Sequence, residues 1–463
     1  MNTLYELWKA SKGLTTDTRA IEPGQIFLAL KGETFNGNEF ALKALEAGAA
    51  YAVVDRDSAI CLRGVSVSVA RKSSGNTSPT PAIDGRIIVV DNTLQALKEL
   101  AAEHRRHLDI PVIGLTGTNG KTTTKELIRE VLSRNFRVSA TKGNLNNDIG
   151  VPLTVLSIPD DCEIAVVEMG ANHPEDIAAL TWVSQPTFGV ITNVGKAHLE
   201  GFGSFEGVKH AKGRLYDWLS EHDGQAFVNV DSPDLFEMAT SRPLSIIPYG
   251  IEGEDVKVLQ ASAEEPFLRM VISGHLLETH LVGAYNAANV MAAVTVGQYF
   301  GVSLKDAIEA IAAYEPSMNR SQLKRTEHNT VIEDAYNANP SSMKVALDNL
   351  EAMAGRKVAL LGEMRELGAD SVAEHAAVVE RLAGMDLEQV CLVGEEFEKA
   401  LEYCRSRRSV SGAFFCDGNT YSATAFKSSD DLAAWLDEHP VEGCTVLVKG
   451  SRSTRMEKVL PKL

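Results

Sequence analysis

Short apolar, β-branched runs alternate with amphipathic stretches along most of the chain. Runs of the first kind fit strands, and apolar residues recurring every three to four positions fit helices packed on a sheet. In the first part of the chain, strands are predicted at 25–30, 51–55 and 86–90, and helices at 39–50 and 94–107. The Ser-, Pro- and Gly-rich segment 71–85 predicts a surface loop or linker.

The middle of the chain repeats this alternation with more uniformly apolar strands. Strands are predicted at 110–115, 137–141, 163–169 and 187–194, and helices at 121–135, 174–184, 205–219, 286–300 and 304–314. Runs that are apolar at every position suit parallel strands covered on both faces, with helices as crossovers. Residues 255–282 instead alternate apolar and polar side chains, which predicts an antiparallel meander.

The last part of the chain has a compact strand–helix rhythm. Its strands are predicted at 331–335, 357–361, 389–393, 413–416 and 445–448. This rhythm predicts a doubly wound α/β layer. We therefore expect three α/β domains: a small one at 1–90, a central parallel-sheet domain at 91–315 and a third at 316–463. A length of 463 residues is compatible with that number.

The charge balance limits the partners. There are 45 Lys and Arg against 62 Asp and Glu, a formal net charge of −17 at pH 7. A nucleic acid or an anionic membrane requires a basic surface, so neither is an expected partner. Any phosphate that this protein binds must be held by local groups, against the field of the whole chain.

The N-terminal segment and the cysteines favour a protein of the cytoplasm. The chain does not begin with a basic segment followed by an apolar one, and no apolar run reaches the roughly 18–20 residues of a membrane helix. Six cysteines are scattered without a CxxC pair. That spacing favours free thiols over disulfides or a zinc site.

A glycine-rich turn between a predicted strand and a predicted helix is the strongest functional motif. Glycines let backbone N–H groups turn inward, Lys121 can reach the β- and γ-phosphates, and the Thr122 hydroxyl can bind Mg²⁺. The usual GxxxxGK[ST] spacing would need glycine at Leu115, so Gly117 supplies the turn in a variant spacing. An ordinary glycine-rich turn is the alternative. The predicted ATP-binding residues of this motif are Gly117, Thr118, Asn119, Gly120, Lys121, Thr122 and Thr123.

Polar residues near the ends of neighbouring predicted strands are candidates for the same crevice. Glu168 ends one strand and can bind Mg²⁺, or it can be a solvated glutamate. His198 follows the next strand and can bind a second metal or a phosphate, or be structural. Lys212 lies on the following helix near Lys209 and His210, where a surface charge cluster is the simpler interpretation.

In the third domain, a predicted strand ends at Asp334, and the polar residues Tyr336, Asn337 and Asn339 open the next helix. Arg320 lies just upstream and could reach a nucleotide from a mobile domain. Asn-Pro turn and helix-capping chemistry also accounts for the asparagines, and the two roles are compatible.

Together these motifs resemble the Mur ligase family of peptidoglycan synthesis, over nearly the whole chain. The most specific stretches are 114–124, 141–152 (TKGNLNNDIGVP), 167–172, 198–203, 334–340 (DAYNANP), 361–368 (LGEMRELG) and 449–452 (KGSR). The stretches 141–152 and 334–340 resemble the members that add D-alanyl-D-alanine in particular.

The resemblance implies an N-terminal domain that binds a UDP-sugar, a central P-loop-type ATPase domain and a Rossmann-like C-terminal domain. The implied reaction adds D-alanyl-D-alanine to UDP-N-acetylmuramoyl-tripeptide through an acyl phosphate, with ATP and Mg²⁺ as cofactors and ADP and phosphate as products. A monomer is expected.

The resemblance also implies roles for single residues. Lys121 and Thr122 would hold the ATP phosphates and Mg²⁺, Glu168 and His198 a second Mg²⁺, and Lys212 matches a lysine that carries a carbamate and helps to bind that metal. Asn289, Arg320 and Asp334 match nucleotide contacts. The expected substrate residues are Asp17, Thr18, Arg19, Asn36, Asn144, Asn146, Asn147, Tyr336, Asn337 and Asn339.

Some positions depart from the family pattern. Asn36 and Asn38 lie where the family usually has Asp-Gly-His, Tyr285 replaces a histidine, Glu363 replaces an aspartate, and 318–320 (MNR) replaces Gly-Arg. These changes affect the expected uridine and adenine contacts. A diamino-acid-adding or folylpolyglutamate-type ligase would share the fold and the ATP site, and a nucleotide-dependent switch would use the loop without ligation.

Overall fold

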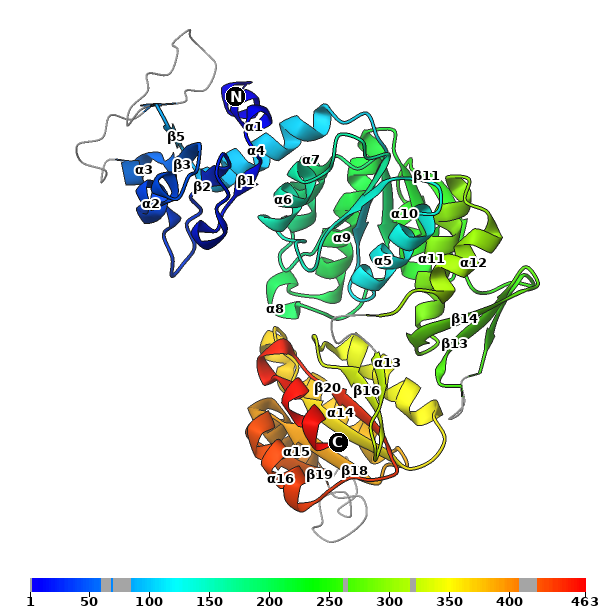
Figure 1. The fold of residues 1–463 in the computed structure, drawn as a ribbon. Helices are drawn as coiled ribbons and strands as arrows, with labels where there is room; N and C mark the ends of the chain where they lie inside the picture. The colour runs from blue at the N-terminus through cyan, green and yellow to red at the C-terminus, as the bar shows by residue number, and fades with distance from the viewer. Residues whose placement is uncertain (1, 60–67, 70–84, 261–264, 317–321, 408–422) are drawn as a thin grey trace. The chain divides into compact units, whose positions relative to one another are not determined.

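The computed structural model describes residues 2–59, 68–69, 85–260, 265–316, 322–407 and 423–463 (Figure 1). The described residues form two compact units. The first combines residues within 1–112 with 139–169 and 179–186, and the second combines 113–138 and 170–178 with residues within 187–463. The predicted domain boundaries near 90 and 315 stay predictions.

The first sheet is built from the N-terminal strands, in the order β1-β2-β3-β5-β4 with all pairs parallel. Its strands are β1 (Leu14–Thr15), β2 (Ile26–Leu28), β3 (Tyr51–Asp55), β4 (Ser68–Val69) and β5 (Ile87–Val90), and its helices are α1 (Asn2–Ala10), α2 (Ala41–Glu46), α3 (Arg56–Ala59) and α4 (Thr93–Arg106). Alternate strand residues bury opposite faces: Ile26 packs in one core with Leu97 of α4, and Phe27 in another with Ala44 of α2. The predicted helix at 39–50 is shorter in the structure, because the chain turns at Gly48 with a φ of +106°.

The second sheet has the order β11-β10-β9-β6-β8-β7. Its strands are β6 (Val112–Thr116), β7 (Val138–Ala140), β8 (Ile164–Glu168), β9 (Phe188–Ile191), β10 (Gln225–Asn229) and β11 (Ser245–Tyr249). The accompanying helices are α5 (Lys121–Leu132), α6 (Gly150–Leu156), α7 (Asp176–Ser184), α8 (Leu199–Phe202), α9 (Phe205–Glu221), α10 (Pro233–Thr240), α11 (Asn286–Tyr299) and α12 (Leu304–Ala312). Every residue of β6 and β8 is buried, as expected for parallel strands covered on both faces.

A small antiparallel sheet follows, and it confirms the predicted meander. Its strands are β12 (Val256–Leu259), β13 (Phe267–Ile272) and β14 (His275–Val282). Both strand pairs are antiparallel, and β13 alternates half-buried and buried side chains. The link between β13 and β14 is a two-residue turn, Ser273-Gly274, in which both residues have positive φ.

The third sheet has the order β15-β16-β20-β17-β18-β19, and only the β15–β16 pair is antiparallel. Its strands are β15 (Gln322–Arg325), β16 (Thr330–Asp334), β17 (Lys357–Gly362), β18 (Gln389–Val393), β19 (Ala423–Phe426) and β20 (Thr445–Lys449). Its helices are α13 (Pro340–Ala352), α14 (Ser371–Ala383), α15 (Glu395–Arg407) and α16 (Ser429–Glu438). The strand predicted at 413–416 lies outside the described residues. Because β16, β20, β17 and β18 are parallel, their carboxyl ends share one edge of the sheet.

Two expectations about the whole chain concern membranes and thiols. Among the described residues, no helix is long and apolar enough to cross a membrane. Among the described residues, four cysteines are buried and form no disulfide: Cys162, Cys391, Cys404 and Cys444.

Candidate active site

The predicted phosphate loop lies where expected, between β6 and α5. Gly117 has a φ of +149°, and a Cβ on it would lie 1.9 Å from Thr192 Oγ1. Gly120 precedes α5 with a φ of +77°, and a Cβ on it would lie 2.8 Å from Asn289 Oδ1. Both positions therefore need glycine for backbone conformation and for space. The N-terminus of α5 adds backbone N–H groups that favour an anion.

The segment after β9 braces this loop. The Thr118 N–H donates to the Asn193 carbonyl at 3.0 Å, and the Asn119 N–H donates to Asn193 Oδ1 at 2.9 Å. The Thr192 hydroxyl donates to the Asn119 carbonyl at 2.6 Å, and the Gly195 N–H donates to Thr118 Oγ1 at 3.0 Å. Side-chain and backbone hydrogen bonds therefore fix the loop from one side.

Lys121 and Asn289 complete the loop from within the second unit. The Lys121 ammonium donates to the carbonyls of Gly117 (2.7 Å) and Thr118 (3.1 Å), so it lies over the loop. Asn289 accepts a hydrogen bond from the Thr124 hydroxyl at 3.0 Å and donates to Asn286 at 2.9 Å. Asn289 is thus a buried neighbour of the loop, and its contact with a nucleotide stays a prediction.

Lys212 is buried rather than part of a surface charge cluster. Only 2% of the residue is exposed, and its Nζ lies 5.8 Å from the centre of the Phe202 ring. Burial, followed by the positive charge of Lys121, lowers the pKa of the Lys212 amine well below its usual range. Its neighbour Lys209, in contrast, pairs with Asp234 at 2.9 Å. Within one helix, the structure separates an ordinary ion pair from an unusual buried amine.

His198 immediately precedes α8 in a left-handed conformation, with a φ of +50°. Its Nδ1 pairs with the Glu366 carboxylate within the second unit. This contact, with burial opposing it, lowers the pKa of Glu366. A non-glycine residue with positive φ is uncommon, and such residues often occur at functional sites.

Glu168 ends β8 in the first unit and is 1% exposed. Its Oε1 accepts a hydrogen bond from Asn146 Nδ2 at 2.8 Å, and its N–H donates to the Thr141 hydroxyl at 2.9 Å. Asn147 accepts from the Gly150 N–H at 2.8 Å at the start of α6, and Asn144 is exposed. The structure therefore brings Glu168 and the 141–152 motif together.

The predicted N-terminal site residues form short capped turns. Asp17 accepts from the Arg19 N–H at 2.9 Å and pairs with the Arg19 guanidinium at 2.8 Å. These contacts lower the pKa of Asp17 to about 2. Thr18 begins this 3-10 turn. Asn36 accepts from the N–H and the side chain of Asn38, at 3.2 and 2.8 Å.

Asn38 is a residue whose role sequence reasoning missed. It is 3% exposed, its Nδ2 donates to Asp55 Oδ2 at 2.9 Å, and its Oδ1 accepts from the Asp55 N–H at 2.8 Å. Asp55 in turn accepts from the Thr93 N–H at 2.7 Å. The asparagine thus fixes the turn that carries Asn36. Its departure from the family pattern was the one available sequence signal.

The third-domain candidates lie at the carboxyl edge of the third sheet. Asp334 pairs with Lys449 at 2.5 Å, and Lys449 also donates to the Asn337 carbonyl at 3.2 Å. The Arg452 guanidinium lies over the Tyr336 ring, with its Cζ 5.8 Å from the ring centre. Asn339 caps α13 through Ser342, and its Nδ2 donates to Asn119 Oδ1 at 2.9 Å. Arg320 lies outside the described residues.

The expected Mg²⁺ requires oxygen ligands, and two of the residues predicted to bind it have them. Thr122 and Glu168 carry hard oxygen ligands, and both are buried at the starts or ends of rigid elements. Among the described residues, however, no group of three or more His, Cys, Asp and Glu side chains is arranged to hold a metal. A Mg²⁺ at either residue would need phosphate oxygens or water to complete its coordination, which is how Mg²⁺ commonly binds with nucleotides.

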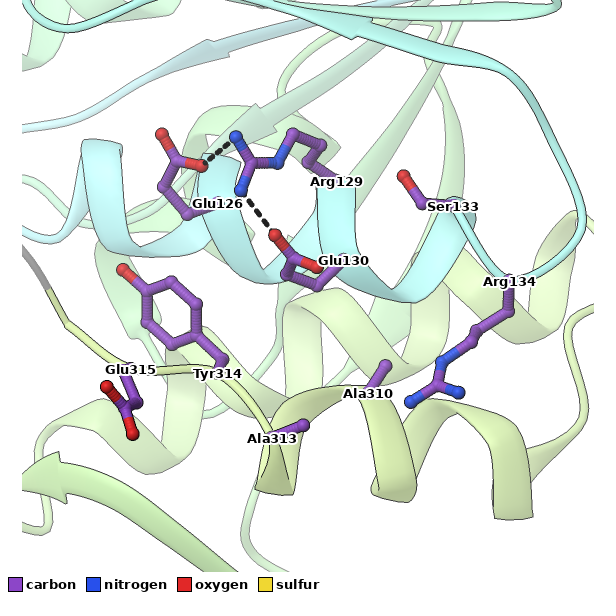
Figure 2. Close-up of a pocket in the computed structure, with 9 residues that line it drawn as sticks. All are labelled: Glu126, Arg129, Glu130, Ser133, Arg134, Ala310, Ala313, Tyr314 and Glu315. Atoms are coloured by element: carbon purple, nitrogen blue, oxygen red, sulfur yellow. Dashed lines mark hydrogen bonds and ion pairs between the residues drawn. The ribbon is translucent and has the colours of Figure 1, made fainter.

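A separate hollow of about 480 Å³ lies between the later turns of α5 and the end of α12 (Figure 2). Its lining residues are Glu126, Arg129, Glu130, Ser133, Arg134, Ala310, Ala313, Tyr314 and Glu315. Arg129 pairs with Glu126 at 2.8 Å and also with Glu130, so these two carboxylates neutralise the Arg129 charge. None of the predicted site residues lines this hollow.

Comparison with known proteins shows a full-length relationship. Family models match in three consecutive regions: "Mur ligase family, catalytic domain" at 11–105, "Mur ligase middle domain" at 115–297 and "Mur ligase, glutamate ligase domain" at 319–452. The chain is 34% identical to the UDP-N-acetylmuramoyl-tripeptide–D-alanyl-D-alanine ligase of Escherichia coli, over 97% of this chain and 93% of that protein.

Solved structures agree with this relationship. A MurF structure from Acinetobacter baumannii matches with a TM-score of 0.81 and 30% identity, covering 100% of this chain and 98% of that one. A MurF structure from Thermotoga maritima in complex with ADP matches with a TM-score of 0.78 and 26% identity, covering 99% and 97%. These matches confirm the predicted three-domain α/β fold.

Proposed function

Because this chain belongs to the Mur ligase family, we propose that it joins D-alanyl-D-alanine to UDP-N-acetylmuramoyl-tripeptide, driven by ATP, in the synthesis of peptidoglycan precursors. The observation that carries this assignment is full-length similarity to a ligase of that name, at 34% identity. The phosphate loop supplies the nucleotide site that the reaction needs, and an ADP complex of a similar MurF supports the use of ATP.

The chemistry explains why ATP is required. A carboxylate does not acylate an amine in water, because its oxygen is a poor leaving group. The tripeptide carboxylate therefore attacks the γ-phosphorus of ATP, the bond to ADP breaks, and an acyl phosphate forms. The amine of D-alanyl-D-alanine then attacks the acyl carbon, phosphate leaves and the nitrogen releases a proton. The protein contributes positioning and charge stabilisation.

The phosphate loop accounts for much of that stabilisation. Its inward N–H groups and Lys121 would hold the β- and γ-phosphates, and Asn289 would face the nucleoside. Asp334 and Arg320 would bind the nucleotide from the third domain. A Mg²⁺ held by Thr122 and the phosphates, and a second near Glu168 and His198, would neutralise charge that develops on the transferred phosphoryl group.

Lys212 has the properties that carbamate formation requires. Only a neutral amine attacks CO₂, and burial lowers the pKa of this amine. The amine nitrogen bonds to the carbon of CO₂, the electron pair of one C–O π bond moves onto that oxygen, and the nitrogen loses a proton, so the neutral amine becomes an anionic carbamate. An anion at this position would offer oxygens to the second Mg²⁺.

We assign the substrates to three groups of residues. The UDP-sugar would lie at the N-terminal turns, the tripeptide at the 141–152 loop and the dipeptide at the edge of the third sheet. The residues of these groups are, in that order, Asp17, Thr18, Arg19 and Asn36; Asn144, Asn146 and Asn147; and Tyr336, Asn337 and Asn339. We further propose a monomer that works in the cytoplasm, where ATP and nucleotide-linked sugars are found; light scattering of the purified protein tests the monomer.

One assay tests the function and its alternatives. Phosphate release from ATP is measured with UDP-N-acetylmuramoyl-tripeptide, with and without D-alanyl-D-alanine, and mass spectrometry identifies the product. We expect release that requires both substrates and a product extended by two alanines. Activity with a single diamino acid and the matching dipeptide precursor would instead identify a diamino-acid-adding ligase. Nucleotide binding without turnover in any arm would favour a switch.

A further inference from the structure

His375 lies on α14 and contacts the turn that follows β17. The residue is 0% exposed. Its Nε2 accepts a hydrogen bond from the Met364 N–H at 2.9 Å, and its Nδ1 lies 2.7 Å from the carbonyl of Ser371. A carbonyl accepts, so Nδ1 carries the proton and Nε2 is free to accept. Both contacts together require the neutral ring with its proton on Nδ1.

The surroundings favour that neutral ring. The Phe397 ring packs against it in a T-shaped pair, with the ring centres 4.7 Å apart and the planes perpendicular. Burial lowers the pKa of His375 against the opposing influence of the Ser371 carbonyl and of Glu396, Glu363 and Glu374. A doubly protonated ring would direct an N–H at the Met364 N–H and break that hydrogen bond.

The turn held by His375 joins three strand ends of the third sheet. The Glu363 N–H donates to the Val393 carbonyl at 2.9 Å, at the end of β18. The Glu363 carbonyl accepts from the Ser451 N–H at 3.2 Å, just after β20. Glu363 is 4% exposed. Its carboxylate accepts a hydrogen bond from the Glu396 N–H at 3.2 Å and pairs with the Arg365 guanidinium at 2.6 Å.

The turn also has a conformation that requires support. Glu366 has a φ of +62° and Gly368 a φ of +55°. A left-handed conformation costs a non-glycine residue on the order of 1–2 kcal/mol, so it persists where neighbouring contacts fix the backbone. The hydrogen bond from Met364 to the His375 ring is such a contact, two residues before Glu366.

We propose that His375 is a positioning residue for the ligase reaction: its Nε2 fixes the 363–368 turn and, through the Glu363–Ser451 contact, sets the edge of the third sheet that carries Asp334 and Lys449. This proposal rests on the proposed function. His375 is fully buried. It acts through the backbone of the turn, and a shift of about 1 Å in groups that position a substrate can lower a rate on the order of 10²-fold.

Two variants separate the two ring contacts. His375→Gln places an amide oxygen near the position of Nε2, where it can accept from Met364. His375→Asn keeps a donor near the position of Nδ1 but does not reach Met364. His439→Asn is the matched control, because His439 lies in the same domain, places its Nδ1 3.0 Å from the carbonyl four residues earlier, and is exposed.

Three measurements are made on each full-length variant: kcat and KM for every substrate, the unfolding temperature, and hydrogen exchange of the peptide that covers 363–368. His375→Asn is expected to lower kcat about 10- to 100-fold, to leave the KM for the UDP-substrate within about twofold, and to speed exchange of this peptide. His375→Gln should recover most of kcat and of the protection. His439→Asn should match the wild type.

The proposal is overturned if folded His375→Asn keeps the wild-type kcat, or if exchange at 363–368 does not change. It is also overturned if folded His375→Gln loses as much activity as His375→Asn. If His375→Asn does not fold, His375→Gln alone decides: a kcat near that of the wild type supports the proposal, and a lost kcat overturns it. A wild-type protein that forms no product refutes the proposed function and the positioning role with it, whereas exchange still reports whether the ring fixes the turn.

Discussion

Gly117→Ala should weaken nucleotide binding without unfolding the protein. The added Cβ would lie 1.9 Å from Thr192 Oγ1, far closer than two non-bonded atoms can approach. Either the loop or Thr192 must therefore move. Thr192 is not free to move without loss, because its hydroxyl donates to the Asn119 carbonyl at 2.6 Å and so helps to fix the phosphate loop.

The size of the effect follows from two contributions. The φ of +149° at Gly117 lies in a region that alanine occupies at a cost of about 1–3 kcal/mol. Loss of the Thr192–Asn119 hydrogen bond adds about 0.5–1.5 kcal/mol. If the loop relaxes out of its binding conformation, the sum of about 1.5–4.5 kcal/mol corresponds to a loss of affinity of roughly 10- to 10³-fold.

The assay is a calorimetric or fluorescence titration with ADP, with the unfolding temperature measured in parallel. Gly301→Ala is the matched control, since Gly301 also has positive φ (+89°) but its Cβ would meet nothing within 4 Å. It should lower stability by about 1 kcal/mol and leave ADP affinity unchanged. Adding Thr192→Ala to Gly117→Ala removes the clashing oxygen and should not restore full affinity, because the backbone strain and the lost brace remain.

Folded Gly117→Ala that binds ADP within twofold of the wild type would refute this reasoning. The same conclusion would follow if Gly301→Ala weakened ADP binding as strongly, because backbone strain alone would then explain the effect.

Three further predictions concern buried charged or titratable groups. Lys212→Ala should lower kcat on the order of 10²-fold or more while the circular dichroism spectrum persists, and wild-type turnover would reject its assignment to the metal site. Burial lowers the pKa of His104 to about 4 from about 6.5, so the neutral ring stabilises the fold above pH 6.5 and that contribution, about 3 kcal/mol, is lost as the pH falls from 6.5 to 4. The free energy of unfolding, measured with urea, should therefore fall less for His104→Phe than for the wild type between pH 7 and 4.5. Equal falls in the two proteins would contradict this. Lys449→Met removes the buried ammonium that pairs with Asp334 and should lower the free energy of unfolding in urea by about 3 kcal/mol. Adding Asp334→Asn should recover most of that loss. If the loss is not recovered, the ion pair is not its cause.

The sequence predicts features that depend on neighbouring residues. Gly117–Thr122 follows a buried strand and opens a helix, and the structure has this arrangement because turn, glycine freedom and helix start are local properties. The parallel strands β6, β8 and β9 were predicted for a similar reason, since their apolar runs are buried on both faces. No strand was predicted at β10, although it is also largely buried. β11 was missed because its residues are largely exposed or half-buried and Pro248 interrupts the run.

Contacts between distant residues could not be predicted in the same way. Asp334 and Lys449 are 115 positions apart, and only the pairing of β16 with β20 brings them together. Lys212 is an intermediate case. It follows Val208 and precedes Leu215 on the apolar stripe of α9, and this helical spacing was the available signal that the lysine is buried.

The braced phosphate loop has a consequence for the energetics of nucleotide capture. The hydrogen bonds between the loop and Thr192–Gly195 restrict the loop residues within the folded chain. The conformational entropy of that restriction is lost when the chain folds, so it does not subtract from the affinity for ATP. ADP can then be exchanged for ATP without reorganising the loop between turnovers, because the loop conformation that binds the phosphates is already set when the chain folds.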